Sequence, residues 1–110
     1  MSRKCRSKRI NFLKLNDDFY DDLGIIRLLK LPNGDSLCSL YLRAYCAALR
    51  TGGIITRSPA MSLEKQLAFM IHANSDMVAM VRDMLQFCSE YGLIMDDGML
   101  IDFVSYWGLP

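Results

Sequence analysis

The sequence predicts an α+β fold that is mainly α, a winged helix-turn-helix with a small three-stranded antiparallel sheet. Two amphipathic segments, residues 63–71 and 76–91, are separated by a short polar break, as in a helix-turn-helix. A hairpin is predicted next, because Asp97-Gly98 separates two apolar runs at 93–95 and 99–104. The isolated β-branched segment 53–56 supplies the third strand that so small a sheet needs.

The length and composition predict one soluble domain. With 110 residues, 52% of them hydrophobic, the chain can bury one core without disulfides or metal, and it is too apolar to be disordered. No run approaches the roughly 18 uncharged apolar residues of a membrane span. We therefore expect a cytoplasmic protein that makes no membrane contact.

The cysteines and the single histidine exclude several kinds of site. The four cysteines contain no Cys-x-x-Cys pair, and His72 is the only imidazole, so we expect no metal site. No nucleophile with a supporting base and no glycine-rich phosphate loop can be found, so we expect neither an enzyme nor a cofactor. The thiols are interpreted as buried and reduced, with Cys38 and Cys46 on one helix face.

The charge is distributed unevenly along the chain. Residues 1–15 carry six basic and no acidic side chains, whereas the remaining 95 residues carry seven basic and twelve acidic ones, a net charge of −5. This pattern predicts a flexible basic arm at residues 1–10 that seeks a polyanion such as DNA, although a solubilising terminus would look the same. The candidate DNA-binding cations of this region are Arg3, Lys4, Arg6, Lys8, Arg9 and Lys14.

Two helices are predicted before the lone strand. The first runs from about residue 18 to residue 30, where Phe19, Leu23 and Ile26 recur at helical spacing, and Pro32 ends it. The second runs from 35 or 36 to 49 and has an apolar face broad enough to imply deep burial. Ser62 is positioned to cap the third helix, and Gly92 to end the fourth.

The fourth helix is the candidate recognition helix, but few of its residues suit DNA. The candidates in this region are Asn74, Ser75, Arg82 and Gln86. The formal charge of residues 76–91 is −2, and the predicted wing tip carries Asp96 and Asp97, which phosphates would repel. Two interpretations remain open: the helix docks in a DNA groove, or the helix and wing mainly serve protein contacts.

Self-association is predicted from hydropathy. The mean hydropathy is +0.14, and Leu28, Tyr41, Tyr45 and several methionines lie on helical faces. That is more apolar surface than a domain this small easily hides, so we expect a homodimer or higher oligomer.

Several motifs resemble a known family. They are residues 14–22 (KLNDDFYDD), 26–36 (IRLLKLPNGDS), 40–42 (LYL), 91–94 (YGLI), Asp97-Gly98 and Tyr106-Trp107. Together they are similar to the N-terminal domain of phage replisome organisers, which are related to DnaD-type replication initiation proteins. The resemblance implies a winged-helix domain at 11–107, followed by a tail at 108–110.

The resemblance also implies a function. It implies initiation of phage or prophage DNA replication in a bacterial host cell, without catalysis. It implies DNA contact, self-association or both, and a host or phage helicase or helicase loader as a possible partner. The alternatives are a protein-interaction module with little DNA binding and a winged-helix transcription regulator.

Overall fold

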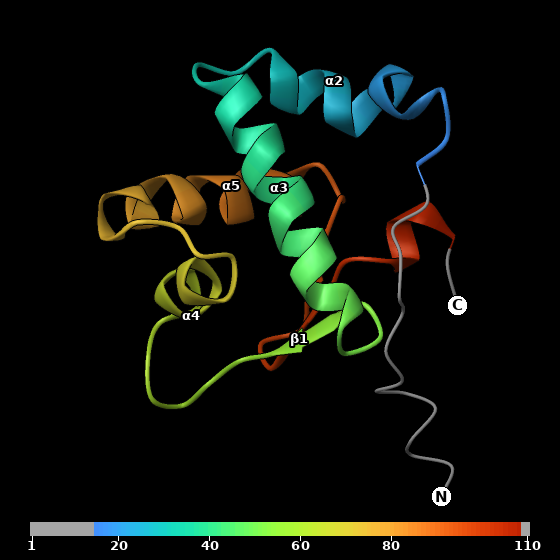
Figure 1. The fold of residues 1–110 in the computed structure, drawn as a ribbon. Helices are drawn as coiled ribbons and strands as arrows, with labels where there is room; N and C mark the ends of the chain where they lie inside the picture. The colour runs from blue at the N-terminus through green and yellow to red at the C-terminus, as the bar shows by residue number, and fades with distance from the viewer. Residues whose placement is uncertain (1–14, 109–110) are drawn as a thin grey trace, which may run out of the picture.

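The computed structural model describes residues 15–108, which form helices around one small antiparallel sheet (Figure 1). This arrangement confirms the predicted fold class, α+β and mainly α. Short 3₁₀ turns, labelled η, stand beside the α-helices and strands. The elements are η1 (Phe19–Asp21), α2 (Leu23–Leu29), α3 (Gly34–Leu49), β1 (Ile54–Thr56), α4 (Leu63–Met70), η2 (Ser75–Met77), α5 (Val78–Glu90), β2 (Met95–Asp96), β3 (Leu100–Asp102) and η3 (Ser105–Trp107).

The sheet is assembled as predicted, with the lone strand joining the hairpin. Its strand order is β1-β3-β2, and both pairings are antiparallel. Ile55 of β1 lies opposite Ile101 of β3, and both side chains are buried. The Phe103 amide extends this pairing by donating to the Gly53 carbonyl at 2.9 Å. Strand β1 therefore fixes the hairpin to the helical body.

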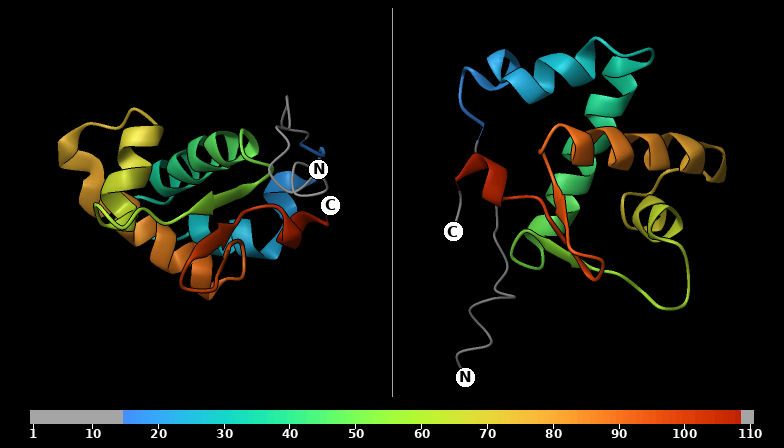
Figure 2. Two further views of the ribbon diagram at one scale, coloured as in Figure 1. Left: turned by 90° about the horizontal axis from the view of Figure 1, so that it is seen from below. Right: turned by 180° about the vertical axis from the view of Figure 1, so that it is seen from behind.

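Helix α3 lies at the centre of the core. Helices α2, α4 and α5 all pack against it, and α4 and α5 pack against each other. Figure 1 shows α3 crossing in front of α5, and Figure 2 shows the crossing from behind. The predicted deep burial of α3 is confirmed. The largest fully buried side chains of the described residues are Tyr41, Tyr45, Phe103, Ile25, Leu28, Leu40, Leu67, Met84, Leu93, Ile101, Val81 and Cys88.

The single helix predicted at 18–30 was wrong, because the chain breaks at Asp22. A 3₁₀ turn ends there, Asp22 is extended (φ −64°, ψ 135°), and α2 begins at the next residue. The Asp22 carboxylate accepts a hydrogen bond from the Ile25 amide at 3.1 Å. Asp22 is thus the N-cap of a shorter helix. Aspartate favours an N-cap over a helix interior because its side chain accepts a hydrogen bond from a nearby backbone amide.

The fourth helix and the hairpin strands are shorter than predicted. Helix α5 begins at Val78 after the turn η2, not at residue 76. The strands predicted at 93–95 and 99–104 were too long, because the amides of Leu93 and Ile94 still bond to the Cys88 carbonyl. At the other end, the Asp102 carboxylate accepts from the Val104 amide at 2.9 Å and turns the chain into η3.

The prediction that the cysteines are buried was wrong for Cys46. Cys38 and Cys88 are buried, but Cys46 is exposed, and Cys5 lies outside the described residues. Eight helical positions rotate the side chain by about 80°, which takes Cys46 off the buried face of α3.

The apolar residues used to predict self-association were wrongly assigned to the surface. Leu28, Tyr41 and Tyr45 are at most 2% exposed and belong to the core. Other large apolar residues are exposed instead, at least 37% of each side chain. They are Leu15, Tyr20, Leu23, Met61, Phe69, Met95, Met99, Leu100 and Tyr106.

Candidate nucleic-acid and protein-contact surface

The helix-turn-helix is built by α4, the turn at 71–74 and α5. Ser62 caps α4 as predicted, its hydroxyl accepting from the Lys65 amide at 3.4 Å. His72 lies two residues after the end of α4, in the left-handed region with φ +59°, and is exposed. The Arg43 guanidinium, reaching across from α3, donates to the Ile71 carbonyl and holds the end of α4 in place. The turn is therefore anchored to the core helix.

The predicted residues of this unit lie on the surface, in two groups. Asn74 and Ser75 are exposed at the turn that leads into α5. Arg82 and Gln86 are exposed on α5, four positions apart and therefore on one helix face. Each is adjacent to or within one turn of an exposed acid, Asp83 or Glu90. The six arm cations lie outside the described residues.

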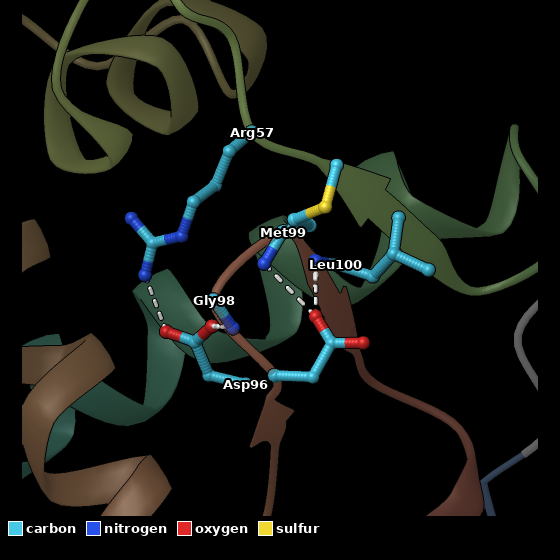
Figure 3. Close-up of polar contacts among 6 residues, drawn as sticks. Arg57, Asp96, Gly98, Met99 and Leu100 are labelled. Carbon is cyan, nitrogen blue, oxygen red and sulfur yellow. Dashed lines mark hydrogen bonds and ion pairs between the residues drawn. The ribbon is translucent and has the colours of Figure 1, made fainter.

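We call the hairpin of β2 and β3, residues 95–102, the wing, and its turn is held together by its own carboxylates (Figure 3). The Asp97 carboxylate accepts from the Met99 amide at 2.9 Å and the Leu100 amide at 2.7 Å. These backbone bonds, chiefly that from Leu100, hold the pKa of Asp97 below its usual value. The Asp96 carboxylate accepts from the Gly98 amide at 2.9 Å. The acids of the wing tip thus have a structural role.

An ion pair joins the wing to the segment after β1. The Arg57 guanidinium is paired with the Asp96 carboxylate, and both side chains are partly exposed (Figure 3). The Arg57 amide also donates to the Met99 carbonyl at 2.8 Å. Arg57 is therefore committed to the wing, where Asp96 neutralises it. Sequence reasoning missed this pair because the two residues are 39 positions apart.

The wing presents apolar side chains that the sequence prediction did not single out. Met95 is 59% exposed and Met99 71% exposed, with Leu100 beside them. The signal was present in the strand alternation: buried Ile101 points inward, so its neighbour Leu100 must point outward. A phosphate-binding wing would instead present Lys or Arg at these positions.

The segment after the wing closes back onto the start of the described chain. The Tyr106 hydroxyl donates to both carboxylate oxygens of Asp22 at 2.9 Å. The Trp107 ring stacks on Phe19 at 5.2 Å between centroids, and its Nε1 donates to the Tyr41 hydroxyl at 2.8 Å. Burial raises the pKa of Tyr41 far above its usual value, so it stays a neutral hydroxyl. We call Asp22, Tyr41, Tyr106 and Trp107 the clasp.

The described residues contain neither a metal-binding cluster nor a helix that could span a membrane. Within residues 15–108, no three His, Cys, Asp or Glu side chains gather as a metal site would require. None of the helices in that range combines the length and the apolar character needed to cross a bilayer.

The fold and this surface define a helix-turn-helix domain with an appended antiparallel hairpin. The family model of the N-terminal phage replisome organiser matches residues 12–105, nearly the whole chain. The chain therefore belongs to the N-terminal phage replisome organiser family, as its sequence motifs predicted, and this membership supports a role in phage replication. No curated protein and no solved structure matched the chain.

Proposed function

We propose that this domain acts in the initiation of phage DNA replication as a DNA-tethered assembly module. In this proposal the basic arm holds DNA, the helix-turn-helix and wing mainly make contacts with other proteins, and the domain also associates with itself. The supporting observation is that the exposed surface of α5 and the wing is acidic and apolar rather than basic. We expect the domain to act in the cytoplasm of the host cell, and the proposal includes no catalytic step.

The charges of the recognition helix favour this division of labour. Arg82 is the only basic side chain in α5, whereas Asp83 and Glu90 are exposed on the same helix. An acid that faces a phosphate costs binding energy, and a single arginine neutralises at most one or two phosphates. Sequence-independent affinity for DNA is therefore expected from the six cations at residues 1–15, which no acid offsets.

The wing favours a protein partner. Exposed methionines adapt to varied apolar surfaces, and Met95 and Met99 stand at the wing with Leu100. The nearby Arg57 is already paired with Asp96. The partner class suggested by a replication role is a host or phage helicase or its loader. If the arm binds no DNA, the same surface supports the alternative function of a protein-interaction module.

The experiment compares duplex binding of the full chain with that of a variant lacking residues 1–9. The deletion removes five of the arm cations, and it should abolish most of the affinity at low salt. A matched control keeps the composition and charge of residues 1–9 in scrambled order, and it should bind like the parent. Arg82→Ala should cost about 1–3 kcal/mol at most, and only at a specific site.

Fluorescence anisotropy of a labelled duplex measures all four proteins in one buffer. If the deletion leaves binding intact while Arg82→Ala destroys it, α5 reads DNA directly and the proposal is wrong. If none of the proteins binds at low salt, the interaction-module alternative replaces it.

A further inference from the structure

Helix α3 leaves one face outside the core. A sector of the helix about 100° wide contains six residues that lie outside the buried core. They are Asp35, Ser39, Leu42, Arg43, Cys46 and Arg50. All are exposed except Leu42, which is half-buried. In Figure 1 this helix runs along the front of the molecule. We call these six residues the α3 face.

Two hollows flank the middle of the α3 face. One, of about 360 Å³, lies toward the start of the helix, where Tyr20 and Leu29 form its far wall. The other, of about 300 Å³, lies toward the end of the helix, where Met70 and His72 form its far wall. Leu42 and Arg43 line both hollows and separate them. The face is therefore a ridge between two shallow grooves of similar size.

The charges on the α3 face are opposite at its two ends. Asp35 carries the negative charge near the start, and Arg50 carries a positive charge near the end. Leu42 and Arg43 stand midway between them, and the Arg43 guanidinium is already bonded to the Ile71 carbonyl. If a second copy of the helix is laid against the first in the opposite direction about this midpoint, Asp35 of each copy faces Arg50 of the other. Ser39 then faces Cys46, and Leu42 meets the centre of the other ridge.

We propose that two copies of this chain associate through the α3 face, with their α3 helices antiparallel and related by a twofold axis beside Leu42 and Arg43. A twofold interface must be self-complementary, and the opposite charges of Asp35 and Arg50 give the two ends of this face that property. Asp35 and Arg50 set the register, because a parallel arrangement would place like charges opposite each other.

The inference rests on the self-association included in the proposed function and adds the surface that performs it. It leaves α5 and the wing on the opposite side of α3, free for other contacts, since Figure 2 shows α5 in front when the molecule is viewed from behind. Two copies would bring two basic arms to one stretch of DNA, which raises affinity by multivalency.

The test uses two charge reversals, Asp35→Arg and Arg50→Asp, in the full chain. Each alone places like charges opposite each other twice per dimer, and each should weaken dimerisation about tenfold or more. Mixed in equal amounts, the two variants restore opposite charges at both contacts and should form a one-to-one heterodimer. Lys65→Asp and Asp76→Arg, matched exposed changes on α4 and η2, are the controls and should dimerise like the parent.

Sedimentation velocity at tens of micromolar measures the mass of each sample, and circular dichroism checks that each variant folds. A parent dimer, monomeric single variants and a heterodimer in the mixture support the proposal. A parent dimer that both variants retain overturns the α3 surface but leaves self-association standing. A mixture that stays monomeric overturns the antiparallel register, and a monomeric parent overturns both this surface and self-association.

Discussion

The Tyr41 hydroxyl is the polar centre of the clasp, and its removal should destabilise the whole domain. The ring is fully buried, the hydroxyl accepts from Trp107 Nε1 at 2.8 Å, and it donates to the Leu93 carbonyl at 3.4 Å. Tyr41→Phe keeps the ring and deletes both bonds. Two neutral hydrogen bonds and the partners left unpaired give an expected cost of about 1–3 kcal/mol.

The assay is urea unfolding followed by tryptophan fluorescence, with a thermal melt beside it. The midpoint should fall without a change in the denaturant slope, and Tm should fall by roughly 4–8 °C per kcal/mol. Trp107→Phe retains a ring that can stack on Phe19 but removes the donor, and its unfolding is followed by far-UV circular dichroism. In a double-mutant cycle, the two changes should couple by about 0.5–1.5 kcal/mol.

Tyr106→Phe is the matched control. It also deletes one tyrosine hydroxyl of the clasp, but this hydroxyl is exposed and bonds to Asp22 at the surface. Its loss should cost less than about 1 kcal/mol. A Tyr41→Phe variant as stable as the parent, or a coupling near zero, would refute the view that the buried hydroxyl joins the chain ends to the core.

Three further predictions concern the core, the β1 turn and the wing. Met84→Ala should destabilise by about 2–5 kcal/mol in urea unfolding, because the side chain is fully buried; a smaller loss would mean that the cavity collapses. Gly53→Ala should cost about 1–3 kcal/mol, because φ is +90° and an added Cβ would lie 2.8 Å from Cγ2 of Val104; unchanged stability would contradict that crowding. Because the folded pKa of Asp97 lies below its usual 3.8, its contribution to the wing turn is present above pH 3.8 and is lost as the pH falls through the depressed value. The Leu100 amide shift in NMR should follow that acid transition and lose it in Asp97→Asn; a titration at the usual pKa would contradict the hydrogen bonding.

The sequence predicted the elements whose signal is local. The Asp97-Gly98 turn, the Ser62 cap and the lone strand predicted at 53–56 each follow from a few adjacent residues, and the structure has all three, with the strand at Ile54–Thr56. The broad apolar face of α3 predicted its central place in the core. Helix ends were predicted less well. The spacing of apolar residues placed Asp22 inside a helix, whereas its carboxylate bonds to the Ile25 amide and makes it the N-cap of α2.

The candidate surface depended on contacts between distant parts of the chain. The Arg57–Asp96 pair neutralises one of the two acids at the wing tip, and no spacing rule predicts a contact between residues so far apart. Periodicity identified apolar positions on α3 but did not show which of them face the core. Tyr41 was therefore assigned to the surface although it is buried, and Cys46 to the core although it is exposed. The arm was predicted from the charge distribution alone, and its six cations lie outside the described residues.

The salt dependence of duplex binding tests the central claim most directly. If the arm holds DNA through five or six phosphate contacts, the logarithm of the binding constant should fall with the logarithm of salt concentration at a slope of about −4 to −5. Deletion of residues 1–9 should flatten that slope toward zero. A steep slope that survives the deletion would contradict the account, because the phosphates would then be neutralised by the domain body, whose net charge is −5.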